Sequence, residues 1–337
     1  MTNDQCYNPP GTLANLSPGS ESPLSQAVTS CPRCQRRTPA ARGECIYCGA
    51  SLPLSSIDTA PLQRNIDTGE LAFNAVIQPV RSVDNDTAVD SLAFALQLEL
   101  EEAQALIGSR KPVPVARSQT SQEAEMICAL VRGCGFSAAV VSDQEMRLQT
   151  ELLRARRLAL SETEIQVTHS AGTLLLARSD VRLLVLGELS YKRIDYVEGL
   201  SGSRGRSAGV VDSSEYSSEE TVLDVYAGSL GTGFRIRSDA FDYSGLVSSL
   251  SIRSDLNFKA AITILREGLP HARVDDDFRK MGRLLERAWP RRSRNEPRGF
   301  KRTGLAFRSV AQASTLSDNR DQFERYSRLM FLSLAGQ

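Results

Sequence analysis

Four cysteines near the N-terminus have the spacing of metal ligands. The polar segment 30–52 contains two Cys-x-x-Cys pairs, Cys31 with Cys34 and Cys45 with Cys48. Two residues between the thiols let both sulfurs of a tight turn face one point, and a second turn completes a tetrahedron of thiolates around Zn²⁺. Four thiolates leave no coordination position for a catalytic water. The spacing therefore predicts structural zinc, whose binding would supply the folding energy of a segment that lacks a hydrophobic core.

Paired disulfides and a redox-active dithiol are two other interpretations of this pattern. Disulfides need an oxidising compartment, but the N-terminus shows no basic stretch followed by an apolar run, and the 7 cysteines of the chain are an odd number. A redox-active pair would lie between a strand and a helix. Cys128 and Cys134, further along the chain, fit a buried helix face and a helix end. The sequence thus favours zinc and a cytoplasmic location.

The cysteine segment resembles the short zinc-ribbon modules found at the ends of many bacterial multidomain proteins. The resemblance lies in "CPRC", "CIYCG" and the trailing "ASL", and it covers residues 30–52.

Length, charge and missing motifs limit the possible functions of the whole chain. With 337 residues it should contain about two or three domains. Its 40 basic and 40 acidic residues cancel, so no overall field would attract it to DNA or to an acidic membrane. No apolar run approaches the roughly 20 residues needed to span a bilayer. The two histidines, His169 and His271, are far apart, and no phosphate-binding glycine motif is present. We therefore expect no catalytic residues and no cofactor beyond zinc.

Composition and periodicity predict a multidomain α+β protein. Its parts would be a four-cysteine zinc ribbon, a small βααβαβ sandwich, and a mainly antiparallel β barrel-like domain closed by a C-terminal helix. The predicted divisions are a disordered N-terminus at 1–29, the zinc ribbon at 30–52, a linker at 53–70, an α/β domain at 71–143, a connector helix at 144–160, a mainly β domain with a helix at 161–270, with a disordered loop at about 200–219, and a helical, basic segment at 271–337.

Residues 73–142 resemble the C-terminal domain of the bacterial ribosomal stalk protein and its relative, the Clp protease adaptor. The parallel lies in "LEEAQALI", a connecting strand, "SQEAEMICALVRGCG" and a last strand. In that family the domain is not an enzyme but offers a helical face to a protein partner. Residues 160–270, with several strands followed by the amphipathic helix "SDLNFKAAITILREGL", loosely resemble a pleckstrin-homology-like fold in architecture alone.

The C-terminal segment concentrates charge. Asp275, Asp276 and Asp277 could form a metal site, but three acids in the first turn of a helix also complement its dipole, which is the interpretation we favour. Downstream lies a basic patch made of Arg291, Arg292, Arg294, Arg298, Lys301 and Arg302. The last apolar stripe, in "DQFERYSRLMFLSL", predicts a helix that folds back onto the body.

These features predict a non-catalytic cytoplasmic adaptor or scaffold that binds other proteins through several small domains. The alternative is a zinc-ribbon factor associated with RNA or DNA. Its phosphate contacts would come from Arg33, Arg36, Arg37 and Arg42 in the ribbon, and from Arg291, Arg292 and Arg294 in the basic patch.

Overall fold

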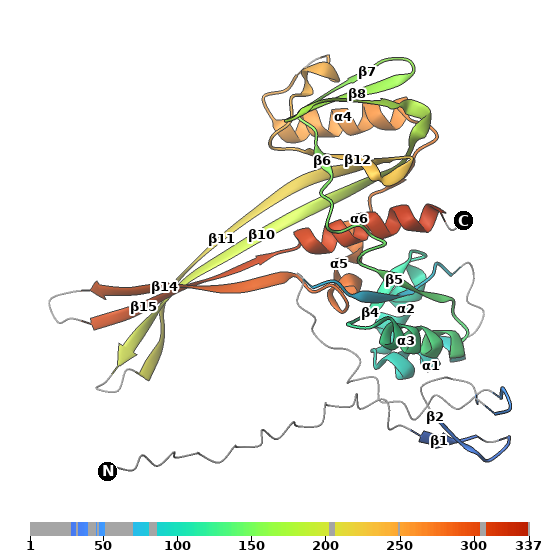
Figure 1. Cartoon of the computed structure of the whole chain (residues 1–337). Coiled ribbons are helices and arrows are strands. Elements are labelled where there is room, and N and C mark those ends of the chain that lie inside the picture. Colours follow the sequence, from blue (N-terminus) through green and yellow to red (C-terminus); the bar gives the residue numbers. More distant parts are fainter. Residues whose placement is uncertain are drawn as a thin grey trace, which may run out of the picture. The chain divides into compact units, whose positions relative to one another are not determined.

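The structure, a computed structural model, describes residues 28–31, 33–39, 45, 47–50, 70–80, 86–201, 206–248, 250–303 and 308–335. The chain forms two compact units, residues 1–57 and residues 58–337. Most of the predicted disordered N-terminus and linker lies outside the described residues. Within these, the fold is mixed α+β, as expected (Figure 1). Four cysteines cluster in the first unit.

The first unit contains a short antiparallel hairpin beside the cysteines. Its strands are β1 (Val28–Ser30) and β2 (Arg37–Pro39), paired with Ser30 opposite Arg37. Among the described residues of this unit, the hydrophobic cluster consists of the buried Cys31 and Cys45 with the partly buried Cys34, Cys48 and Ala50. A metal ion, not a hydrophobic core, is the natural source of stability for so small a unit.

The second unit begins with elements in the predicted β-α-α-β-α-β order. They are β3 (Phe73–Ile77), α1 (Asp86–Leu96), α2 (Leu100–Gly108), β4 (Val113–Ser118), α3 (Ser121–Gly133) and β5 (Ala138–Ser142). β3 lies between β4 and β5 in an antiparallel sheet. The Thr120 hydroxyl accepts the Glu123 N–H at 3.2 Å and caps the start of α3. Gln97, with φ of 53°, makes the corner between α1 and α2.

The predicted connector helix at 144–160 is wrong. Turns cover residues 143–149, and two strands follow, β6 (Leu153–Arg154) and β7 (Arg157–Leu160). The buried Arg328 guanidinium donates to the carbonyls of Met146, Arg147 and Thr150. These carbonyls therefore bond to a side chain from the far end of the sequence, which no local pattern reveals.

Two sheets follow these strands. β7 pairs with β8 (Glu164–His169), which pairs with β9 (Gly172–Ala177). The larger sheet has the order β14-β15-β10-β11-β12-β6, with β13 parallel to β10. Its remaining strands are β10 (Val181–Ser201), β11 (Arg206–Ala227), β12 (Ser229–Arg237), β13 (Arg273–Asp275), β14 (Arg292–Thr303) and β15 (Arg308–Asp318). Two 3₁₀ turns, Arg178–Asp180 and Tyr243–Gly245, connect elements of this region.

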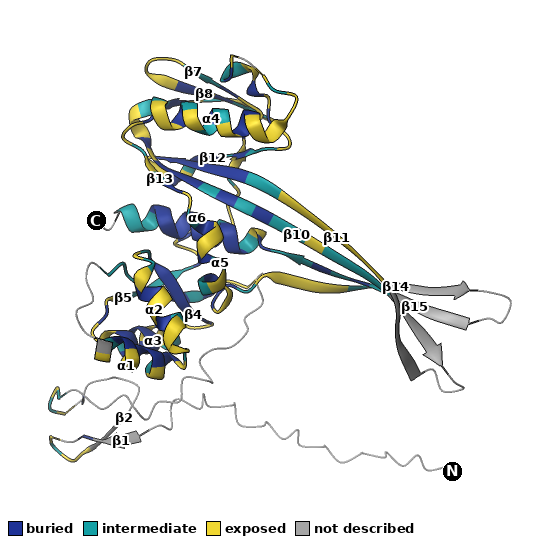
Figure 2. Cartoon of the chain, turned by 180° about the vertical axis from the view of Figure 1, so that it is seen from behind, coloured by how far each residue is buried: buried dark blue, intermediate teal, exposed yellow. Residues whose placement is uncertain are grey.

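The predicted amphipathic helix is present as α4 (Ser254–Gly268). Its buried Phe258, Ala261 and Leu265 belong to one hydrophobic core with residues of the two sheets, including Ile165 and Leu184 (Figure 2). The buried stripe is the one that the helical periodicity predicted.

The prediction of a disordered loop at 200–219 is wrong for residues 206–219, which belong to β11; residues 202–205 lie outside the described part. β11 pairs with β10 from Ser201↔Arg206 to Val181↔Ala227. The polar composition misled the prediction because backbone pairing stabilises this strand without burial. The C-terminal segment is likewise not wholly helical, since the hairpin β14–β15 lies between α5 (Phe278–Glu286) and α6 (Arg320–Ala335).

The C-terminal helix α6 folds back onto the body, as expected. Its predicted apolar face is buried, namely Phe323, Tyr326, Leu329 and Met330. Nearby, the buried Trp289 donates from Nε1 to Asn74 Oδ1 at 2.7 Å, and Arg287 donates to the Leu96 carbonyl. The C-terminal elements therefore contact the βααβαβ elements directly and are not a separate appendage.

Candidate metal centre and charged clusters

The four predicted ligands lie together. The sulfur atoms of Cys31 and Cys48 are 3.6 Å apart, and those of Cys34 and Cys45 are 3.5 Å apart. All four ligand atoms lie within 4.8 Å of one another. A tetrahedron with metal–sulfur bonds of about 2.3 Å has sulfur–sulfur edges of about 3.8 Å. The cluster therefore has the size and donor chemistry of a site for one thiophilic metal ion.

Two equivalent turns present the thiols. In the first, Gln35 N–H donates to the Cys31 carbonyl at 2.8 Å, and in the second, Gly49 N–H donates to the Cys45 carbonyl at 2.9 Å. Gln35 and Gly49 both have left-handed backbones, with φ of 59° and 65°. Glycine adopts this conformation without strain, whereas glutamine does so at a cost. The sequence therefore signalled the second turn more clearly than the first.

Backbone amides favour thiolates in this cluster. The Cys34 amide lowers the pKa of Cys31 more than burial raises it. Burial raises the pKa of Cys45, but the N–H groups of Tyr47 and Cys48, together with hydrogen bonds from the Cys34 and Cys31 thiols, outweigh it and bring the pKa to about 6. For Cys48, burial and hydrogen bonds with the other thiols outweigh the Ala50 amide and raise the pKa to about 12. The pKa values of Cys31 and Cys45, the two buried thiols, are thus shifted toward the thiolate form that binds metal.

The remaining described cysteines show no sign of reactivity. Burial raises the pKa of Cys128 to about 11, and it also raises the pKa of Cys134. Cys128 lies in the core on α3, as its helical spacing indicated. Both thiols therefore remain protonated near neutral pH.

The arginines of the first unit are only partly described. Arg33 and Arg36 are exposed, and the Arg36 guanidinium lies 5.1 Å from the centre of the Tyr47 ring. Arg37 belongs to β2, and Arg42 lies outside the described residues. Stacking on Tyr47 gives Arg36 a structural contact within its own unit.

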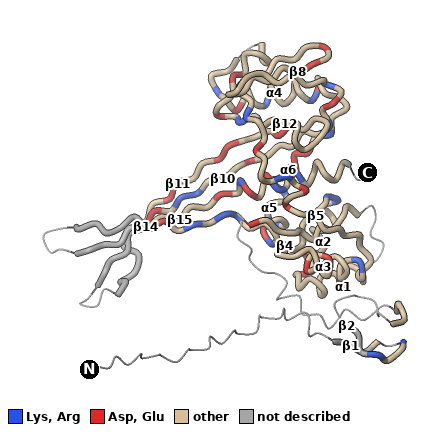
Figure 3. The backbone as a smooth tube through the Cα atoms, in the orientation of Figure 1, with Lys and Arg blue, Asp and Glu red and all other residues tan. Residues whose placement is uncertain are grey.

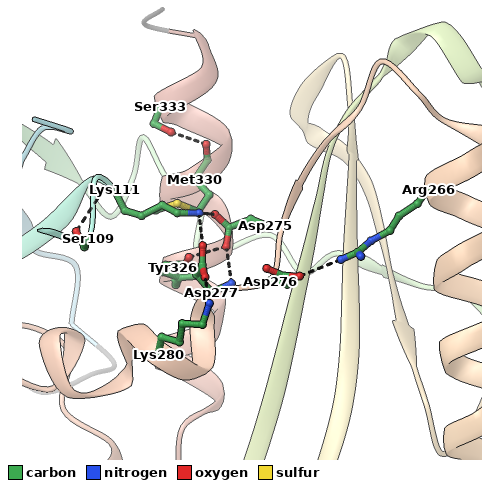
Figure 4. Close-up of polar contacts among 10 residues, drawn as sticks. All are labelled: Ser109, Lys111, Arg266, Asp275, Asp276, Asp277, Lys280, Tyr326, Met330 and Ser333. Atoms are coloured by element: carbon green, nitrogen blue, oxygen red, sulfur yellow. Dashed lines mark hydrogen bonds and ion pairs between the residues drawn. The ribbon is translucent and has the colours of Figure 1, made fainter. Parts of the chain in front are cut away.

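The three consecutive aspartates are neutralised by cations. Lys111 pairs with Asp275 and, at 3.0 Å, with Asp277, while Arg266 pairs with Asp276 at 3.1 Å (Figure 4). Tyr326 of α6 donates to Asp275 at 2.6 Å. Asp275 ends β13, and α5 begins only after Asp277, so the prediction that the three acids lie in the first turn of a helix is wrong. Lys111, which the sequence analysis did not single out, therefore joins the start of β4 to β13 and α5.

Lys111→Met is expected to destabilise the second unit by about 3 kcal/mol at neutral pH, because it leaves a buried carboxylate without its cation. Burial lowers the pKa of Lys111, but Asp275 and Asp277 outweigh it and raise the pKa; Lys280 and then Lys111 lower the pKa of Asp277. The stabilisation that charged Lys111 contributes is present below about pH 10 and is lost as the pH rises through the pKa of Lys111 in the folded protein. The stabilisation that ionised Asp277 contributes is present above about pH 4 and is lost as the pH falls through the pKa of Asp277 in the folded protein.

Urea unfolding of the wild type and the variant across pH checks this expectation. The difference in free energy of unfolding should be level between about pH 5 and 9 and shrink below about pH 4. Lys280→Met removes an exposed cation that also pairs with Asp277 and should cost less than about 1 kcal/mol. Equal losses for the two variants would contradict a structural role for Lys111.

The predicted basic patch begins just before strand β14 and continues along it, and its described arginines have acidic neighbours. Arg291 lies 3.6 Å from Glu286, Arg292 lies 3.9 Å from Asp321, and Arg294 lies 3.1 Å from Glu296. Figure 3 shows basic and acidic residues mixed along the described parts of the neighbouring strands. Mixed charge of this kind weakens the case for a phosphate-binding surface.

Comparison with known proteins identifies no relative of this chain. The chain matches no protein-family model, and no curated protein or solved structure is similar to it. Among the described residues, no helix is both long and apolar enough to cross a membrane. Any function must therefore be argued from the chain's own surfaces.

Proposed function

We propose that this protein is a non-catalytic cytoplasmic adaptor that binds other proteins and carries one structural Zn²⁺ on its four clustered cysteines. Four thiolates are soft ligands that suit Zn²⁺, and a closed set of four is typical of structural sites. Reduced thiols of this kind persist in a reducing compartment, which supports the cytoplasm.

The observation that carries the proposal is a long ribbon of four strands. It consists of β14, β15 and the outer parts of β10 and β11, and it extends away from α5 and α6 (Figure 1). Every residue from Ser213 to Glu219 on β11 is exposed, as are residues 291–295 at the start of β14. An antiparallel sheet usually needs a buried face or a covering helix for stability. A partner that covers this ribbon would supply such a face.

Both long edges of the ribbon are open among the described strands. β12 pairs with β11 only from Val222 to Ala227, so the portion Arg206–Thr221 has no strand on its outer side. On the opposite edge, β14 pairs only with β15. Exposed edges and extended surfaces of this kind are recognised by strands and loops of other proteins. Natural monomers usually shorten or cover them.

The charges of the ribbon favour a protein over a nucleic acid as its partner. Lys192 pairs with Glu215 at 2.8 Å and Arg193 with Asp195 at 2.9 Å, so the described basic residues alternate with acids. A phosphate backbone selects a continuous basic surface. Protein interfaces accept mixed charges at their rims.

A variant with a shortened ribbon tests the proposal. Asn-Gly would replace Tyr191–Ser218 and also Ser293–Ser317, because Ser190 faces Glu219 and Arg292 faces Asp318 in register. Asn319 would still bond to the backbone of Ser190 and Glu188, at 2.8 and 3.0 Å, and hold α6 in place. We expect the variant to fold with its zinc and to lose the partner.

The measurement is quantitative mass spectrometry of proteins captured by the wild type and by the shortened variant after nuclease treatment. Proteins enriched by the wild type alone would support the adaptor function. Equal capture by both forms, or capture that nuclease abolishes, would contradict it. Zinc content and circular dichroism of the variant serve as the folding control.

A further inference from the structure

The backbone of β11 presents a row of hydrogen-bonding groups at one edge of the ribbon. Beyond the end of β12, Ser238 N–H donates to the Thr221 carbonyl at 3.0 Å, so the backbone groups of Thr221 point away from β10. The register between β10 and β11 is unbroken from Leu183↔Tyr226 to Val197↔Asp212. Because backbone direction alternates along a strand, the same outward direction holds for Ser213, Glu215, Ser217 and Glu219. None of the residues that the structure describes bonds to the N–H or C=O groups of these four.

The opposite edge of the ribbon is protected against pairing. Asn319, just beyond β15, faces β10, because its N–H donates to the Ser190 carbonyl at 3.4 Å. Alternation directs Ala313 to β10 as well, so its partner Pro297 on β14 faces the open side. Proline has no N–H, and the register shifts directly after it, between Pro297 and Gly299. Natural sheets use both features to block pairing at an edge, so β11 offers the edge that can accept a further strand.

An extended backbone is the occupant that matches a row of backbone donors and acceptors. The sheet itself shows this match, because β12 already pairs with β11 from Val222 to Ala227 and then turns away. A strand that is added next to Ser213–Glu219, hereafter the β11 edge, would continue the line of β12.

The composition of the β11 edge disfavours a second copy of this chain as the added strand. Residues 212–220 contain no basic residue but several acids, namely Asp212, Glu215, Glu219 and Glu220. Two such edges would place acids against acids, and like charges directly opposite each other destabilise a strand pair. The added strand must therefore come from a different protein.

Glu219 is the acid of this edge that still needs a cation. Glu215 and Glu220 pair with basic side chains, whereas Glu219 pairs with none among the described residues. Burial and the neighbouring Glu219 raise the pKa of Glu188 on β10, against the opposing effect of Arg279. The two carboxyl groups are therefore close together, and a basic side chain opposite Glu219 would relieve their repulsion.

We infer that the β11 edge binds an extended segment of a partner protein as an added antiparallel strand. The segment places a basic residue opposite Glu219 and, on the other face, an aromatic or β-branched residue opposite the exposed Tyr216. In an antiparallel strand, which continues the direction of β12, the basic residue comes three positions before the aromatic or β-branched one. The inference rests on the proposed protein-binding function and assigns its mode of recognition.

Peptide display on the full-length protein tests this inference without a known partner. The probe is a library of random peptides of about ten residues, long enough to span the β11 edge at about 3.4 Å per residue. We expect the enriched sequences to share a Lys or Arg three positions before an aromatic or β-branched residue. Fluorescence anisotropy with selected peptides then gives the affinities.

Proline substitutions test whether the peptides bind to the backbone. Ser217→Pro removes an outward N–H but no bond to β10, and it should weaken the selected peptides at least about tenfold. Ser293→Pro makes the same change at an outward position of β14 and should leave affinity unchanged. Ser217→Ala keeps the N–H and should also bind as the wild type does. Circular dichroism of the proline variants serves as the folding control.

A charge reversal tests the register of the added strand. Glu219→Lys should weaken the selected peptides about fivefold, and an acidic residue in place of the peptide's basic residue should restore binding. Restoration by an acid at any other position of the peptide would contradict the register.

Three results would overturn the inference: no shared pattern among the peptides, equal affinity for the wild type and Ser217→Pro, or a dimer in light scattering that Ser217→Pro dissociates, which would make a second copy the occupant. If the shortened ribbon loses a cellular partner that Ser217→Pro still captures, strand addition fails while the adaptor function stands. If the peptides bind the β11 edge but the wild type and the shortened ribbon capture the same proteins, the adaptor function fails instead.

Discussion

Replacing Cys45 and Cys48 together by serine is expected to abolish stoichiometric zinc binding. The change removes one of the two turns that present the thiolates, and two of four ligands. Structural zinc contributes about 10 to 16 kcal/mol of apparent binding energy in finger peptides near neutral pH, far more than so small a unit could replace. Elemental analysis of the purified protein measures the zinc content, which should fall from one ion per chain to none.

Cys128→Ser is the matched control, because this thiol lies in the core of α3 and away from the cluster. It should leave zinc at one ion per chain. Residues 58–337 form a compact unit of their own, so their thermal unfolding should change little in the double variant. Full zinc retention in the double variant would contradict the proposed ligand set.

Gly187→Ala is expected to destabilise the second unit by about 3 kcal/mol or more, at the upper end of overpacking effects. A Cβ atom at this position on β10 would lie 2.3 Å from the ring of Phe323 on α6. That ring is fully buried and packs against Phe278, with ring centres 5.0 Å apart, so it has little room to move. Such a loss is a large part of a typical domain's stability of about 5 to 15 kcal/mol. Urea unfolding monitored by Trp289 fluorescence measures it.

Gly282→Ala provides the control for this prediction. A Cβ atom there would meet nothing within 4 Å, and the position lies inside helix α5. Because alanine is the better helix former, the control should be neutral or stabilising by up to about 1 kcal/mol. Phe323→Leu should partly restore the stability of Gly187→Ala by removing the ring edge. A Gly187→Ala protein as stable as the wild type would show that α6 does not pack on β10 at this point.

Local patterns revealed the features that depend on neighbouring residues. The two cysteine turns could be predicted from the sequence because each is formed by four consecutive residues. The residue that follows each turn has a left-handed backbone conformation. The start of α3 was readable because Thr120 and Glu123 cap it locally. The periodicity of α4 and α6 identified the faces that are buried, including Phe258 and Phe323.

Features that depend on residues far apart in the sequence could not be predicted from local patterns. Lys111 and Asp275 are separated by 164 positions, and no local pattern pairs them. The turn at 143–149 is held by Arg328, from the last helix. Residues 206–219 of β11 were mistaken for a disordered loop because their polar side chains are those of a solvated segment, while their order comes from pairing with β10.

Photo-crosslinking in cells tests the central claim, that the ribbon binds another protein, most directly. p-Benzoylphenylalanine would replace Tyr216, which is 61% exposed on β11, and in a control it would replace Leu175, which is 59% exposed on β9. We predict a covalent adduct with a discrete protein at position 216, resistant to nuclease and absent from the control. An adduct that nuclease removes, or equal labelling at both positions, would contradict the account.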